Sequence, residues 1–197
     1  MNERIESLLK KINELQDELH LEMAQLATRF RYTVEERKVI FEQDVAAYHR
    51  RLRQNVWRVL WNIRLPVLLA APFIYSMIFP LLILDIFLTV YQTICFPLYG
   101  IKKVPREAFI VIDRHYLHYL NIFERFNCAF CGYATGLIGY AREVAARTEN
   151  YWCPIKHARR IREAHSLYAG FEEYGDAEGY HARLKRLYGD KSTNIQN

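Results

Sequence analysis

One stretch of this chain is too apolar for a water-exposed surface and too long for one upright membrane helix. Residues 65–101 read LPVLLAAPFIYSMIFPLLILDIFLTVYQTICFPLYGI, which is 37 residues with no Lys or Arg and a single acid, Asp85. A helix needs about 20 apolar residues to cross a bilayer. Pro80 divides the run into legs of about 22 Å and about 28 Å at ~1.5 Å per helical residue. We therefore predict a membrane helical hairpin, either re-entrant or made of two short spans.

The flanks of this run are both basic. Residues 48–64 carry five Arg and no acid, and Lys102 and Lys103 follow the run directly. Cytoplasmic flanks of membrane segments are enriched in Lys and Arg, so the pattern predicts that both ends, and both termini, are cytoplasmic. The alternative is a single tilted span near Phe73–Cys95, kinked at Pro80, with its ends on opposite faces of the membrane.

Residues 48–64 also predict an interfacial helix. Trp57 and Trp61 lie one helical turn apart, so their rings face the same way, and Trp favours the lipid headgroup layer. A stripe in a soluble core is the alternative. The residues predicted to lie at the membrane interface are Trp57, Trp61, Arg58, Arg64, Lys102 and Lys103.

Asp85 is a buried charge in this scheme. An ionisable group within a bilayer costs several kcal/mol unless it faces a partner or water. It would serve as a proton or ion ligand, or it would sit protonated in a protein interface or near the turn of a shallow hairpin.

The N-terminal residues predict a coiled coil of about three heptads. Apolar side chains occupy a and d positions at Ile5, Leu8, Ile12, Leu15, Leu19 and Leu26. The stripe would bind a second copy of the chain or a partner coiled coil, or it would pack on the soluble part of its own chain. Thr33 and Glu36 form a capping box that predicts a second helix.

The charge balance indicates an anionic partner. The net charge is +5 and the isoelectric point about 9.0. Such an excess is typical of proteins that bind nucleic acid or anionic lipid, and beside a membrane segment lipid head groups are the simpler choice.

The cysteines predict a metal centre. Cys128 and Cys131 form a C-x-x-C pair, and Gly132, which directly follows, would accept the positive φ of a metal knuckle. Cys153 precedes Pro154, a favoured first helical residue, which would place Cys153 and His157 on one helical face. A helix over residues 133–149 would bring the two halves together as a Cys₃His site for structural zinc.

Other uses of these residues stay open. With Cys95 in place of His157, four thiolates would suit iron or an iron–sulfur cluster. Cys128 and Cys131 would otherwise be a redox dithiol, or all the cysteines unliganded and buried, while a reducing compartment disfavours a disulfide. His115 and His118 would share a helical face as ligands, or be partly exposed surface residues. The single Glu178–His181 pair falls short of a di-iron site.

Two segments, YQTICFPLYGI and YWCPIKHARR, resemble an uncharacterised family of small bacterial membrane proteins that carry a C-x-x-C and a YWCPIKHA segment. The resemblance covers roughly residues 81–160. It implies a protein of the bacterial cytoplasmic (inner) membrane and points to the same four ligands, Cys128, Cys131, Cys153 and His157. It implies no activity.

Together these features predict a mainly α protein. Its regions are a coiled-coil region (1–47), an interfacial helix (48–64), the membrane hairpin (65–101), a helical metal-binding module (102–170), and a C-terminal helix with a flexible tail (171–197). No nucleophile–base pair, phosphate loop or catalytic carboxylate pair is visible, so the sequence assigns no reaction. We expect a membrane-anchored scaffold or interaction protein with structural zinc. The alternatives are an iron or iron–sulfur redox protein that exchanges electrons with a lipid-soluble carrier, and a thiol or metal sensor.

Overall fold

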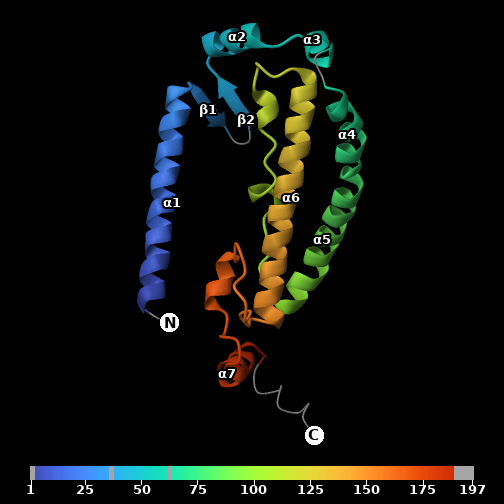
Figure 1. Cartoon of the computed structure of the whole chain (residues 1–197). Helices are drawn as coiled ribbons and strands as arrows, with labels where there is room; N and C mark the ends of the chain where they lie inside the picture. Colours follow the sequence, from blue (N-terminus) through green and yellow to red (C-terminus); the bar gives the residue numbers. More distant parts are fainter. Residues whose placement is uncertain (1–2, 36–37, 62–63, 189–197) are drawn as a thin grey trace. The chain divides into compact units, whose positions relative to one another are not determined.

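The computed structural model describes residues 3–35, 38–61 and 64–188 and is mainly helical, as predicted (Figure 1). The chain forms two compact units, which we treat separately. The N-terminal unit comprises Met1–Val67 and Ile112–Ala129, and the C-terminal unit comprises Leu68–Val111 and Phe130–Asn197. The flexible tail predicted after Asp190 lies outside the described residues.

The N-terminal unit contains helix α1, a two-stranded sheet and two shorter helices. Their bounds are α1 Glu3–Arg29, β1 Tyr32–Glu35, β2 Lys38–Phe41, α2 Gln43–Leu52, α3 Val56–Trp61 and the 3₁₀ helix η2 Arg114–Tyr116.

The C-terminal unit is built around helices α5 and α6. Its bounds are α5 Ile78–Tyr99, η1 Arg106–Ala108, η3 Ser166–Gly170 and α7 Ala177–Tyr188. Two helices begin in the N-terminal unit and end in the C-terminal one, α4 Leu65–Ser76 and α6 Ile122–Trp152.

The prediction of a second helix from the Thr33–Glu36 capping box is wrong. Strands β1 and β2 pair antiparallel there, with Tyr32 opposite Phe41 and Thr33 opposite Ile40. The two central residues of each strand are β-branched, Thr33 and Val34 in β1 and Val39 and Ile40 in β2, and β-branched residues favour a pleated pair over a helix. Arg31 lies between the end of α1 and the start of β1, and its positive φ of 52° is not helical.

The membrane hairpin with a turn at Pro80 is also not formed. Helices α4 and α5 continue one another with Met77 between them, and together Leu65–Tyr99 counts as one 35-residue helix, long and apolar enough to cross a membrane. Pro80 is the third residue of α5. Proline is tolerated in a first helical turn, because the N–H that it lacks has no partner there anyway.

Helix α6 (Ile122–Trp152) begins earlier and ends later than the helix predicted over residues 133–149. Asn121, which is fully buried, accepts a hydrogen bond from the backbone N–H of Glu124 (3.0 Å), and the Glu124 carboxylate accepts one from the backbone N–H of Asn121 (2.8 Å). This reciprocal capping box fixes the first turn. His115 and His118 precede it in η2 and a turn, so the helical face predicted for them does not exist.

The core of the C-terminal unit lies where α5, α6 and the segment after α5 meet. We call residues 101–111 the return segment. Its backbone lies against small residues of α6: a Cβ built on Gly136 would meet the carbonyl oxygen of Phe109 at 2.5 Å. The buried apolar residues of this core are Leu81, Phe96, Val104, Leu137, Tyr140 and Val144.

Candidate membrane-facing helix and the predicted metal centre

Helix α5 has an inverted distribution of polarity. Its covered positions recur every three or four residues, and three polar side chains lie among them, Asp85, Gln92 and Tyr91. We call this side the covered face and the opposite side the exposed face. A helix in a soluble protein buries its apolar stripe and exposes its polar side. In α5 the only charged side chain and the only amide lie on the covered face, beside the buried Leu81 and Phe96, while the exposed face carries large apolar side chains.

The exposed face of α4 and α5 is large and uncharged. Asp85 is the one charged residue between Leu65 and Tyr99, and it belongs to the covered face. Several large side chains of the exposed face are more than half accessible, among them Leu68 60%, Phe79 68%, Ile86 62%, Phe87 70%, Val90 51%, Ile94 57% and Leu98 76%. Contiguous apolar surface of this kind marks an interaction with lipid or with another protein.

Asp85 is paired. Arg106 of η1 donates two hydrogen bonds to its carboxylate, from Nε to Oδ1 (3.1 Å) and from Nη2 to Oδ2 (2.5 Å). The Tyr133 hydroxyl of α6 donates a third, to Oδ2 (3.0 Å). A bidentate guanidinium–carboxylate pair is strong and geometrically specific. Asp85 therefore joins the return segment and α6 to α5.

Gln92 and Tyr91, nearer the C-terminal end of α5, also hydrogen-bond the covered face to the rest of the C-terminal unit. The Gln92 amide accepts a hydrogen bond from the backbone N–H of Val104 (2.8 Å) and donates one to the carbonyl of Val104 (3.2 Å). The Tyr91 hydroxyl bonds to that of Thr148 (3.0 Å). At the end of α5, the Tyr99 ring stacks on Tyr151 with centroids 5.1 Å apart. Asp85, Tyr91 and Gln92 are thus hydrogen-bonded within their own chain.

The residues predicted for the membrane interface are accessible. Trp57 and Trp61 in α3 are 78% and 91% exposed, so within the described residues they do not form the soluble core stripe that was the alternative. The basic residues Arg58, Arg64, Lys102 and Lys103 are exposed as well. Their contact with lipid stays a prediction.

The four predicted metal ligands are not brought together. Cys128 and Cys131 lie within α6, and Cys153 follows its last residue. The 22 residues from Cys131 to Cys153 give a separation of about 33 Å at ~1.5 Å per helical residue. Metal ligands at a zinc ion lie about 2.3 Å from it. These residues do not fit one Cys₃His centre, nor a four-cysteine centre with Cys95, and the described residues contain no group of three or more potential ligands.

Each half of the predicted centre has another structural role. Gly132 is helical rather than at a positive φ, and its missing Cβ admits the carbonyl oxygen of Val111, 3.2 Å from the position where a Cβ would be. After Cys153 the chain is not helical, and Ile155 forms a parallel bridge with Glu172. The His157 ring stacks on Tyr168 (centroids 6.2 Å apart) and does not share a helical face with Cys153. None of the four cysteines is buried; Cys95 and Cys128 are half-buried and the others exposed.

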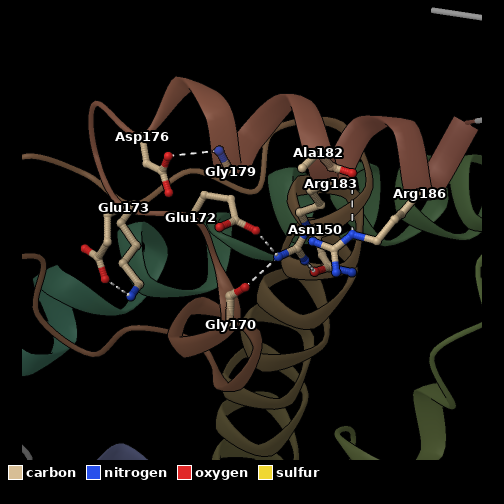
Figure 2. A network of polar contacts seen from close by, with 10 residues as sticks. Asn150, Gly170, Glu172, Glu173, Asp176, Gly179, Ala182, Arg183 and Arg186 are labelled. Atoms are coloured by element: carbon tan, nitrogen blue, oxygen red, sulfur yellow. Dashed lines mark hydrogen bonds and ion pairs between the residues drawn. The ribbon is translucent and has the colours of Figure 1, made fainter. Parts of the chain in front are cut away.

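A polar network holds this segment to α6 and α7 (Figure 2). Arg183 of α7 donates to the carbonyl of Gly170 (2.5 Å) and to the Asn150 side chain (2.9 Å), and it is 3.4 Å from Glu172. Lys156 pairs with Glu173 at 2.6 Å. Asp176 caps α7 through the N–H of Gly179 (2.9 Å). The basic residues of α7 therefore organise the C-terminal unit. Glu178 and His181, also in α7, are exposed.

His118 belongs to an aromatic cluster in the N-terminal unit. Its ring lies edge-on to Phe41, and Phe41 lies edge-on to His49. Burial and the nearby Arg50 and Arg125 lower the pKa of His118 below its usual value. The cluster adjoins a cavity of about 600 Å³ lined by Val39, Ile40, Phe41, Gln43, Ala46, Arg50, Tyr116 and His118.

Helix α1 leaves its predicted heptad stripe uncovered. Leu8, Ile12, Leu15, Leu19 and Leu26 are between 44% and 59% exposed, and the nearest element of the unit is β1. The alternative, in which the stripe packs on the chain's own soluble part, is not observed in the described residues.

Comparison with protein-family models, with curated proteins and with solved structures finds no match to this chain. The resemblance to a bacterial membrane family stays a prediction.

Two features of the structure were not predicted, although the sequence contains a signal for each: the start of α6 and the polar side of α5. The N-x-x-E pattern at Asn121–Glu124 marks the start of α6. Asp85, Gln92 and Tyr99 are seven residues apart, so the polar groups of the apolar run fall on one helical face.

Proposed function

We propose that this chain is a membrane-anchored interaction protein, held in lipid by α4 and α5 and carrying in α1 a helix for association with another helix. The observation that carries the proposal is the inverted polarity of α5. Asp85, Tyr91 and Gln92 are bonded to the rest of the C-terminal unit, while the exposed face carries large apolar side chains and no charge. Hydrocarbon is the surrounding that suits such a face.

The flanks of the apolar helix support the same conclusion. Exposed Trp57 and Trp61 precede it, with Arg58 and Arg64 beside them, and Lys102 and Lys103 follow it. Trp prefers the headgroup layer, and Lys and Arg attract anionic lipids. With basic residues at both ends, we place both termini in the cytoplasm, at the inner membrane of a bacterium.

Helix α1 supplies the interaction. It is 27 residues long, and an isolated helix in water gains little stability without packing. Its uncovered stripe follows a heptad pattern, which a second copy of the same helix would cover.

The anchor is tested by floating the purified full chain with vesicles of phosphatidylcholine, with and without phosphatidylglycerol. We expect it to float with both and to stay bound after washing with 1 M salt or at pH 11, because apolar insertion resists conditions that remove electrostatic binding. A chain that remains soluble and monomeric without detergent or vesicles would contradict the anchor.

The interaction is tested by sedimentation of Leu15→Asp in detergent. Leu15 occupies a d position, and the matched control Leu21→Asp changes an equally exposed leucine outside the a and d positions. We expect Leu15→Asp to be monomeric and Leu21→Asp to associate as the unaltered chain does. Equal behaviour of the two variants would show that the stripe is not the contact.

A further inference from the structure

We infer that Leu65–Tyr99 lies along a single leaflet of the membrane instead of crossing the bilayer, with the exposed face of α5 toward the acyl chains and the covered face of α5 toward the water. This inference rests on the proposed membrane anchor and specifies its geometry. The partner of the exposed face is then the hydrocarbon of one leaflet.

The length of the helix does not suit a crossing. Leu65–Tyr99 has 35 residues, or about 52 Å at ~1.5 Å per residue, whereas the hydrocarbon layer is about 30 Å thick. A crossing that kept all 35 residues within the hydrocarbon would need a tilt of roughly 55°, beyond the range of about 0–40° seen for membrane helices. A helix that lies in the leaflet has no such limit on its length.

A partial crossing leaves a different conflict. If only Leu65–Leu84 crossed, the rest of α5 would stand in water. Its exposed face there carries Ile86, Phe87, Val90, Ile94 and Leu98, each more than half accessible. Placing these groups in lipid requires the whole of α5 to stay at the membrane.

Two arginines lie beside the covered face, in addition to the apolar residues of the core. Arg106 binds Asp85 near the middle of Leu65–Tyr99, and its side chain is 44% exposed. Arg147 of α6 donates to the carbonyl of Lys102 (2.6 Å), just beyond the end of α5. A crossing by all of α5 would carry Arg106 to the middle of the hydrocarbon, where a guanidinium is costly. In one leaflet the covered face and these charges remain on the aqueous side.

The flanks agree with this placement. Arg58 and Arg64 precede the helix, and Lys102 and Lys103 follow it, all of them exposed. The preference of Lys and Arg for the cytoplasmic side places both flanks there. The predicted hairpin would have returned the chain to the cytoplasmic side and so kept both flanks there. One unbroken helix does so only if both its ends stay on the same side.

The experiment measures depth along the helix. Spin labels are attached to single cysteines at Leu68, Phe79, Val90 and Leu98, in a chain whose four native cysteines are replaced by serine. Collision with oxygen and with a water-soluble nickel complex then reports the depth of each label in phosphatidylcholine–phosphatidylglycerol vesicles. Leu88→Cys, on the covered face, is the matched control.

We expect all four labels at one shallow depth, ~5–10 Å below the head groups, and the control label shielded from both reagents. Depth that increases to the middle of the helix and decreases again would overturn the inference in favour of a crossing. Labels shielded from both reagents at all four positions would also overturn it, because a second copy would then cover the face.

A second measurement needs no substitution. Protease is added to sealed vesicles that contain the full chain with a different epitope at each end, and digestion of each epitope is followed. Both epitopes should be cut together or protected together in vesicles of one orientation, and opposite protection would overturn the inference. Failure of the membrane anchor itself gives a different result, since the chain would then not float with the vesicles.

Discussion

Helices α1 and α5 both expose large apolar side chains, and they do so in opposite ways. On α1 the exposed leucines form a narrow stripe on a helix that is otherwise charged, with residues such as Lys10, Glu14 and Asp17 around it. On α5 the exposed face carries no charge, and Asp85, Tyr91 and Gln92 lie on the covered face. A stripe framed by charge suits a partner helix in water, whereas an uncharged face suits hydrocarbon. The two helices therefore differ more in where their polar side chains lie than in how much apolar surface they expose.

The largest expected effect comes from placing charge on the exposed face of α5. In the double variant Ile83→Glu, Phe87→Glu, each carboxylate costs about 2 kcal/mol at a lipid-facing position. At about 1.4 kcal/mol per tenfold change, the partition into vesicles should fall roughly 1000-fold. Flotation over a range of lipid concentrations measures it. The matched variant Leu15→Glu, Leu19→Glu on α1 should bind vesicles normally and lose self-association; a loss of binding in both variants would break the comparison.

A smaller effect is expected at the covered face. Asp85→Ala removes the acceptor of Arg106 and Tyr133, and hydrogen bonds to a charged group contribute about 1.5–3 kcal/mol. The free energy of unfolding in mild detergent should fall by about 2 kcal/mol, while flotation should persist because the exposed face is unchanged. Arg106→Gln should cost a similar amount, and the double variant should cost less than the sum. Strict additivity would show that the pair is not coupled.

The packing that covers α5 can be tested on α6. A Cβ at Gly136 would meet the Phe109 carbonyl oxygen at 2.5 Å, whereas one at Gly139 would meet the Phe109 ring at an ordinary 3.5 Å. Gly136→Ala should therefore displace the return segment and destabilise the chain by about 1–3 kcal/mol. Gly139→Ala should be neutral, or stabilising by up to about 1 kcal/mol, because alanine favours the helix. Thermal unfolding compares the two, and equal melting temperatures would refute the close packing.

The smallest effect is expected from pH. The pKa of His118 is lowered in the folded chain, so between the folded and unfolded pKa values the unfolded chain binds more protons. The contribution of His118 is then full above about pH 6.5, its ordinary pKa, and decreases as the pH falls below that value. We expect a loss of roughly 1 kcal/mol or less by pH 5 in the N-terminal unit, with His118→Gln removing the dependence. Melting curves at several pH values measure it. A stability that rises on acidification would contradict the prediction.

The predicted zinc centre shows where local patterns fail. The C-x-x-C pair and the Cys153–His157 pair are each plausible half-sites. A half-site can be recognised from a few neighbouring residues, but a complete site also requires the two pairs to lie close together in space. Because α6 is one continuous helix from Ile122 to Trp152, Cys131 within it and Cys153 just after its end lie too far apart to reach one metal ion. Elemental analysis of the purified chain tests this conclusion: about one zinc per chain, lost in Cys128→Ser/Cys131→Ser, would show that the cysteines assemble differently.

The sequence by itself determined what depends on local composition. The apolar run between basic flanks and the heptad stripe each predicted a helix, because both patterns follow from side-chain polarity and helical periodicity. The tertiary structure decided what depends on contacts between distant residues. Pro80 lies within a first helical turn instead of a hairpin, Asp85 faces Arg106 and Tyr133, and Gly132 and Gly136 admit the return segment. Packing sets the distances between groups far apart in the chain, and no local pattern contains those distances.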